Sequence, residues 1–387
     1  MDNEYGIDPN SDPLIARSWL NSGIAERAIG EMFCGATYNF GPDGGILIPG
    51  DGRYDPSVLV SSDSIFTRAN TMAQNALNVG QAALAAGALT AEDWYMFDPQ
   101  VIVYSAHALL AQTYMYLEEW DLAVQHAQQV PIEHVEYTHF NEETEVNELW
   151  DIIWDNDDGS VWGEVHEGKL YGVPATALWY DDPRVDVTHC GDWSGDFGGS
   201  ITRKVASSAG CYDYRSESNR YPLWAPNKYD EYGSDQEIFT GVDMVLIQAE
   251  AALVGGNLPL WETHINTLRA YYGLDPLAVS DPQIYPLSAG SLEWPNAEDD
   301  AWSIMDRERY LTLWLHSRRQ MDLRRWEHPF LTDQPYNALI PAHEGLYSGP
   351  RYMWCQPLPS QECNTNPQIT NNAEICGVIP IPPGASG

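Results

Sequence analysis

Aromatic and small polar residues gather in the middle of the chain, between residues 140 and 239. Carbohydrate recognition needs flat apolar faces for the C–H groups of a sugar ring and polar groups for its hydroxyls. Here tryptophan and tyrosine supply the faces, and the interleaved Asp, Asn, Arg and Gly supply polarity and turns. This pattern predicts a ligand-binding platform of Trp193, Tyr212 and Tyr214, with Trp179 and Trp224 nearby. For any one of these side chains taken alone, packing in a core is the more common role.

One acidic run, from Asp155 to Gly159, resembles a calcium-binding loop. Its glycine stands one place too early for an EF-hand, and no second helix follows it. We therefore expect a solvated acidic turn and no cofactor. Calcium held by Asp155, Asp157 and Asp158 is the weaker alternative.

The sequence shows many carboxylates but no arrangement that identifies an enzyme. It has no GxSxG, HExxH or P-loop pattern. A glycosidase would need two carboxylates held roughly 5–10 Å apart, which sequence alone does not establish. We predict a binding protein and not an enzyme. The net charge of −37 excludes nucleic acid as an expected partner, because phosphate binding needs clustered Lys and Arg.

The six cysteines are even in number and form no CxxC pair, which favours disulfides over a zinc site. Disulfides indicate an oxidising, extracytoplasmic compartment. Cys190 with Cys211 and Cys363 with Cys376 would close short loops, and Cys34 with Cys355 would join the two ends of the chain. The connectivity stays open, since six cysteines allow about 15 pairings. No apolar run is long enough to span a membrane, and no signal peptide is visible at Met1.

The elements that would carry the aromatic segment are helical. Helices are predicted around residues 13–33 and 63–86, the second closed by Gly87. Residues 99–129 read as two helices joined at Glu118–Glu119, with the small and large residues of a tetratricopeptide-type hairpin, and residues 242–271 repeat this pattern. The prediction is a tetratricopeptide-like scaffold with a long insertion. The alternative is two unrelated hairpins of a bundle.

A single helix is predicted from Asp306 to Trp326, in which six of the chain's 19 basic residues fall. Leu311, Trp314, Leu315 and Met321 would form its apolar stripe. Partly buried arginines need acidic partners, so this helix would tie the hairpins and the tail together. A solvated charged face is the alternative.

These segments together resemble the SusD/RagB family of surface glycan-binding lipoproteins. The family's signature helix has the form ER-x-x-EL-x-x-EG-x-R-x-x-DL-x-RW, and it is matched by Glu308, Arg309, Leu313, Arg319, Asp322, Leu323, Arg325 and Trp326. Thr312, His316 and Ser317 depart from it. A second motif, P-x-P-x-x-E-x-x-x-NP followed by Asn, is matched by Pro357, Pro359, Glu362, Asn366, Pro367 and Asn371.

The resemblance implies a single, mainly α, SusD-like domain over residues 1–387. Its helical scaffold would cover about 60–130 and 240–326, its aromatic insertion about 140–239, and an irregular tail 329–387. The resemblance further implies a protein of the outer-membrane surface, or an extracellular one if it is not lipid-anchored. Such a protein hands an oligosaccharide to a TonB-dependent SusC-like transporter. A peptide-binding relative and a self-assembling structural subunit of an extracellular filament are the alternatives.

Overall fold

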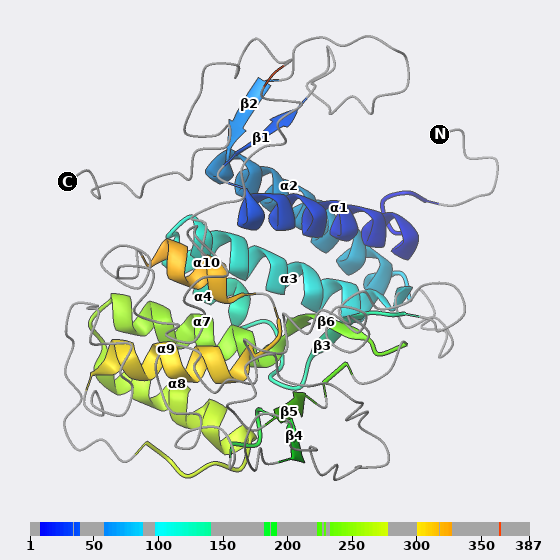
Figure 1. Ribbon diagram of the computed structural model, residues 1–387. Coiled ribbons are helices and arrows are strands. Elements are labelled where there is room, and N and C mark those ends of the chain that lie inside the picture. The colour runs from blue at the N-terminus through cyan, green and yellow to red at the C-terminus, as the bar shows by residue number, and fades with distance from the viewer. Residues whose placement is uncertain are drawn as a thin grey trace.

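Helices make up most of the described part of the chain, as Figure 1 shows. The computed structural model describes residues 8–33, 35–38, 58–87, 97–140, 182–185, 187–191, 223–226, 228–229, 233–277, 300–316, 318–326 and 364. The helices are α1 (Pro13–Met32), α2 (Ser62–Ala85), α3 (Pro99–Tyr116), α4 (Trp120–Ala127), α7 (Gly241–Val254), α8 (Leu258–Tyr271), α9 (Ala301–Thr312) and α10 (Arg319–Arg325). The strands are β1 (Gly35–Tyr38), β2 (Val58–Ser61), β3 (Val135–Thr138), β4 (Val187–Gly191), β5 (Leu223–Pro226) and β6 (Gln236–Thr240). No helix in these ranges has the length and apolar content needed to cross a membrane.

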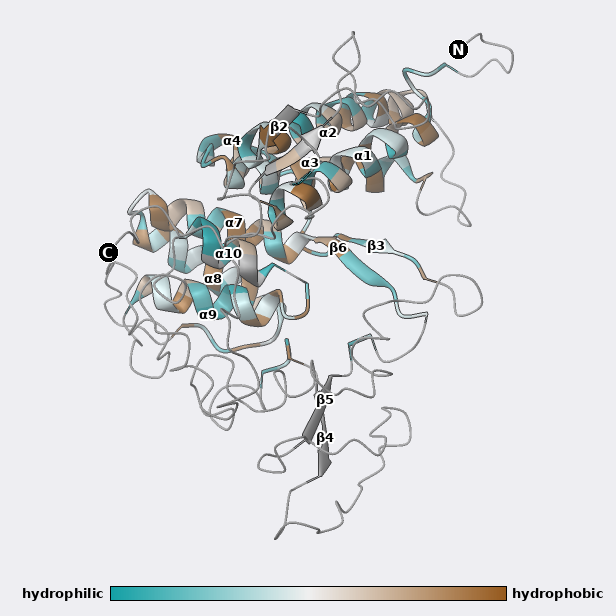
Figure 2. Ribbon diagram, turned by 45° about the horizontal axis from the view of Figure 1, so that its top comes forward, coloured by the Kyte–Doolittle hydropathy of each residue, from teal (hydrophilic) through white to brown (hydrophobic). Residues whose placement is uncertain are grey.

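The first two helices, α1 and α2, pack along each other and against α3 (Figure 1). Asp12 caps α1 by accepting a hydrogen bond from the Leu14 amide at 2.8 Å, and Ser61 caps α2. Fully buried alanines of α2, among them Ala69 and Ala73, allow its neighbouring helices to approach closely (Figure 2). Both helices were predicted, and α1 belongs to the main core through Ala16 and Leu20.

Both predicted hairpins are present. The α3–α4 turn passes through Glu118, whose φ of 59° is unusual for a residue other than glycine. The α7–α8 turn passes through Gly256, with φ of 71°. Helix α4 packs against α7, so the two hairpins adjoin each other as in a helical scaffold. One core cluster centres on α1 to α4, and a second on α7, α8 and α9.

The three small sheets are antiparallel pairs, β1 with β2, β3 with β6 and β4 with β5. Strands β3 and β6 stand at the two ends of the predicted insertion, and their pairing brings its entry and exit together. The β4–β5 pair lies within it. The described part of the predicted insertion therefore contains short strands.

The prediction of one helix from Asp306 to Trp326 is wrong. Helix α9 ends at Thr312, and a turn follows in which Leu315 has φ of 62°. Helix α10 starts only at Arg319. In a straight helix two residues 13 apart would be about 20 Å distant, yet Arg309 and Asp322 form an ion pair at 2.7 Å. The break therefore folds α10 back so that both helices serve one polar network.

Candidate functional site

Strands β4 and β5 flank residues 192–222, which include Trp193, Tyr212 and Tyr214 of the predicted platform. His189 pairs with Trp224, and Gly191 pairs with Leu223, which sets the two ends of segment 192–222 side by side. Trp224 is thus placed in the backbone of β5. Trp179, Trp193, Tyr212 and Tyr214 lie outside the described residues, as do the side chains of all six cysteines and the acidic run with Asp155, Asp157 and Asp158. The platform and the disulfides stay predictions.

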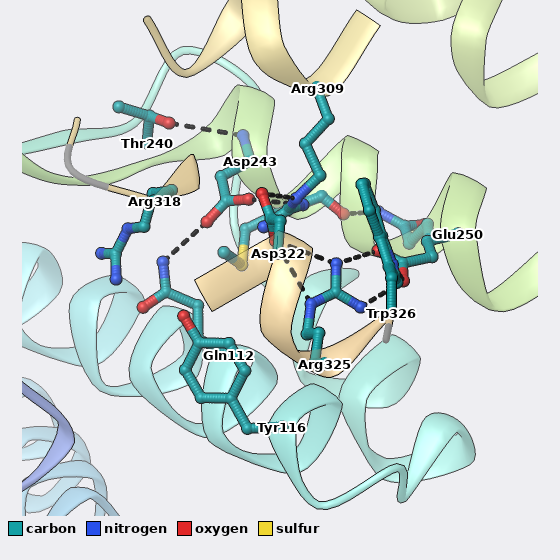
Figure 3. Close-up of polar contacts among 12 residues, drawn as sticks. Gln112, Tyr116, Thr240, Asp243, Glu250, Arg309, Arg318, Asp322, Arg325 and Trp326 are labelled. Carbon is teal, nitrogen blue, oxygen red and sulfur yellow. Dashed lines mark hydrogen bonds and ion pairs between the residues drawn. The ribbon is translucent and has the colours of Figure 1, made fainter. Parts of the chain in front are cut away.

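The signature residues form a buried arginine network on α9 and α10, shown in Figure 3. Arg309 makes ion pairs with Asp243 at 3.1 Å and with Asp322 at 2.7 Å. Arg325 donates to both carboxylate oxygens of Glu250 and pairs with Asp322. The Trp326 indole N–H donates to Glu250 at 2.6 Å. Since Arg309 is 1% exposed and Glu250 is 0% exposed, the alternative of a solvated charged face is wrong.

The same network reaches distant parts of the chain. Arg318 pairs with Glu31 of α1 at 2.5 Å. The Glu308 carboxylate, fully buried, accepts hydrogen bonds from Arg184 and Arg269. Arg319 begins α10, and its side chain is outside the described set. Acidic partners on the hairpins were predicted from the sequence. Glu31 was not predicted, because nothing in the sequence links α1 to α10.

Electrostatics keep the network charged. Burial acts to lower the pKa of Arg309, but the neighbouring Asp322 and Asp243 raise it above its ordinary value. Burial acts to raise the pKa of Asp243, yet Arg309 and Arg318 bring it below its ordinary value. Neither partner titrates near neutral pH. The signature residues therefore hold the scaffold together and leave little chemistry free for a ligand.

A second polar cluster forms where His316 departs from the family signature. His316 Nε2 lies 2.8 Å from Glu237 and 2.7 Å from the Lys228 ammonium, and Lys228 pairs with Glu237 at 2.6 Å. Burial opposes ionisation of Glu237, but the hydrogen bond with His316 and the charge of Lys228 lower its pKa to about 2. This cluster links the turn between α9 and α10 to β6.

Acid is expected to destabilise the fold, because a buried histidine is harder to protonate in the folded chain than in the unfolded chain. Burial lowers the pKa of His134 from its ordinary value of 6.5 to about 4. The unfolded chain therefore takes up this proton at higher pH than the folded chain, and stability is lost as the pH falls from 6.5 towards 4. Below pH 6.5 we expect His134 to contribute a slope of up to about 1.4 kcal/mol per pH unit. Urea unfolding at pH 7, 6 and 5 checks this, and the slope should be smaller for His134→Gln. An equal slope in both proteins would contradict the assignment.

An open pocket of about 230 Å³ lies beside the arginine network, where α3, α4, α7, α9, α10 and the α3–α4 turn meet. Three tryptophans shape it: Trp120 at the start of α4, Trp302 at the start of α9 and Trp326 at the end of α10. The other lining residues are Met115, Glu118, Glu250, Val254 and Arg325. Of the three tryptophans, Trp326 belongs to the signature, and neither Trp120 nor Trp302 was predicted to bind a ligand. These residues span more than 200 positions, so only the tertiary fold brings them together.

Comparison with known proteins gives one family. Residues 225–374 match the family model SusD_RagB, described as the SusD family. No curated protein matches the chain. Among solved structures, the chain is similar to a SusD-like carbohydrate-binding protein from Bacteroides fragilis, with a TM-score of 0.54 at 17% identity over 92% of this chain and 79% of that one. It is also similar to a SusD homologue from Bacteroides uniformis, with a TM-score of 0.58 at 14% identity over 93% and 77%.

A third structure with the same fold is a chitin-binding SusD homologue from Flavobacterium johnsoniae, with a TM-score of 0.50 at 12% identity over 84% of this chain and 69% of that one. SusD-family proteins bind ligands without catalysis, which agrees with the prediction that this chain is not an enzyme. The C-terminal part of the chain therefore matches the SusD family model, and the chain shares the fold of SusD-like proteins over most of its length.

Proposed function

We propose that this protein captures a neutral oligosaccharide at the cell surface and delivers it to a TonB-dependent SusC-like transporter. The observation that carries the proposal is the SusD-family match at residues 225–374 together with the shared fold. The chitin-binding homologue supports a glycan as the ligand. The protein's place would be the outer-membrane surface, or the extracellular space if it carries no lipid anchor.

The charge of the chain narrows the ligand class. With a net charge of −37, the protein repels polyanions over distances comparable to the Debye length. Neutral glycans experience no such repulsion. Binding would rest on aromatic stacking and hydroxyl hydrogen bonds, with no cofactor.

Replacing Trp193 and Tyr214 together with alanine is expected to weaken glycan binding by about 100-fold or more, because aromatic anchors dominate binding energy. The thermal unfolding temperature should stay the same. Tyr271→Ala is the matched control, since Tyr271 is an exposed aromatic on α8, 45% accessible. A glycan array followed by calorimetry measures the effect. Unchanged affinity in the double variant would place the ligand elsewhere.

The same experiment separates the alternative functions. A peptide library bound in place of every glycan would favour a peptide-binding relative. Self-association without any ligand would favour a structural subunit. The transporter step is tested by affinity purification from membranes of cells that express a SusC-like protein from the neighbouring reading frame. Failure to recover that protein would contradict delivery to it.

A further inference from the structure

The walls of the tryptophan pocket are held rigidly. Trp302 and Trp326 meet edge to face, with ring centroids 6.0 Å apart and planes at 72°. Arg325 lies over the Trp326 ring at 4.8 Å from its centroid, and Glu250 fixes both by hydrogen bonds. Figure 3 shows Trp326 and Arg325 converging on Glu250. A rigid aromatic wall loses little entropy when a ligand binds to it.

The rim of the pocket carries a carboxylate that the fold does not use. Glu118 is exposed, in the α3–α4 turn, and within the described ranges no hydrogen bond or ion pair engages its side chain. Its φ of 59° is a conformation that glycine or asparagine adopts more easily. The fold therefore places the Glu118 carboxylate, a hydrogen-bond acceptor, beside three indole rings, although the positive φ at this position is unfavourable for glutamate.

The chemistry of the pocket fits one ring of a neutral sugar. Trp120 and Trp302 are partly exposed and offer apolar faces for C–H groups. Glu118 accepts, and the indole N–H groups of Trp120 and Trp302 are donors for hydroxyls. The volume of about 230 Å³ is below the roughly 300–1,000 Å³ of pockets for drug-sized ligands, which suits one ring and not a chain.

Charge argues against the other ligand classes. Glu118 and Glu250 disfavour an anion. A cation would normally bind over the tryptophan faces. The Arg325 guanidinium already lies over the Trp326 ring, and its charge would repel a second cation. A neutral polar ligand meets neither obstacle.

We propose that this pocket is a second glycan-binding site, which takes one glycosyl unit of the same neutral oligosaccharide. The proposal rests on the proposed function. The pocket lies at the end of α7 opposite to β6, about 20 Å away for a helix of 14 residues. Figure 1 places β4 and β5, which flank residues 192–222 of the predicted platform, far from α4 and α10. Two separated sites would let one protein hold a branched or long glycan by two contacts and so raise its avidity.

The test is calorimetry with chito-oligosaccharides and neutral glucan oligosaccharides on the full chain, together with NMR of the tryptophan indole N–H signals. We expect two sites per chain. Trp120→Ala should weaken one of them by about tenfold or more, and Glu118→Gln should weaken it by about three- to tenfold, since it keeps the shape and removes the charge. Trp19→Ala is the matched control, because Trp19 is 38% exposed on α1 and is not among the pocket residues. It should change neither site.

The outcomes separate this inference from the proposed function. If glycan binds with one site per chain, and Trp120→Ala and Glu118→Gln leave it unchanged, the pocket is not a glycan site although the proposed function stands. If the Trp193 and Tyr214 double variant still binds glycan at one site, and Trp120→Ala abolishes binding at that site, the pocket assignment is supported independently of the platform. If the wild-type protein binds none of these glycans, both proposals are overturned.

A second variant guards against a structural explanation. Glu118→Asn relieves the backbone conformation, so we expect its unfolding temperature to be equal or higher while glycan affinity at the pocket falls several-fold. A merely structural role of Glu118 would give no loss of affinity.

Discussion

Arg309→Met is expected to lower the free energy of unfolding by about 3–5 kcal/mol, because it removes the cation that pairs with two buried carboxylates. Arg309 is 1% exposed and pairs with Asp243 of α7 and Asp322 of α10. Without it, like charges face each other in a region of low dielectric constant. Urea unfolding followed by circular dichroism measures the change.

Arg307→Met is the matched control, two residues away on the same helix. Arg307 is more exposed, and it approaches Glu308 at 3.6 Å, where Arg184 and Arg269 already bind. We expect a loss of about 1 kcal/mol or less, because Glu308 keeps its pairs with Arg184 and Arg269 when Arg307 is removed. Equal losses in the two variants would show that the arginine network is not what joins α9, α10 and α7. Replacing Arg309, Asp243 and Asp322 together with apolar residues of similar volume should recover much of the lost stability.

Gly241→Ala is expected to cost about 3 kcal/mol or more, because there is no space for a methyl group at the junction of β6 and α7. A Cβ atom there would lie 2.0 Å from the carbonyl oxygen of Pro131 and 2.5 Å from that of Ile132. Both obstacles are backbone atoms, so no side chain can rotate away. The Gly241 amide also donates to the His134 carbonyl at 2.7 Å, which a displaced chain would lose. Thermal unfolding and the yield of folded protein measure the effect.

The end of the same helix provides the comparison. At Gly255 a Cβ atom would meet the Ala251 carbonyl at 3.4 Å, which is ordinary contact, and φ is −75°. Gly255→Ala should therefore be neutral or stabilise by about 0.4–1 kcal/mol, through the smaller entropy of the unfolded chain. A similar loss at both positions would mean that the close approach at Gly241 does not determine the outcome.

Local patterns were sufficient to predict the helical scaffold. Apolar periodicity, capping residues and turn glycines act over a few positions, so α1, α2 and both hairpins could be placed from sequence. The family resemblance rested on the same kind of ordered, local motif. The break between α9 and α10 could not be predicted in this way. Leu311 and Met321 look like one stripe and both are buried, but they lie on different helices, and Met321 belongs to the core cluster of α1 to α4.

The candidate sites depended on different information. The aromatic platform was predicted from composition, because the residues that would form it are close in sequence. The pocket was not predicted, because Trp120 and Trp302 are 182 positions apart and each has a local explanation. The partners of the arginines were predicted only as a class, since charge balance demands acids but does not say which. Glu31 is 287 positions from Arg318, beyond the reach of any local rule.

The pair between Arg318 and Glu31 affects when the protein can finish folding during its synthesis. Arg318 holds Glu31, and Arg324 donates to the Gly30 carbonyl from 294 positions away. At synthesis rates of about 5–20 residues per second, the end of α1 waits roughly 15–60 s for these partners to leave the ribosome. Until then Glu31 has only Arg27 from its own helix at 3.4 Å and the later Tyr116 hydroxyl. Completion of the native fold is thereby postponed until nearly the whole scaffold has been made.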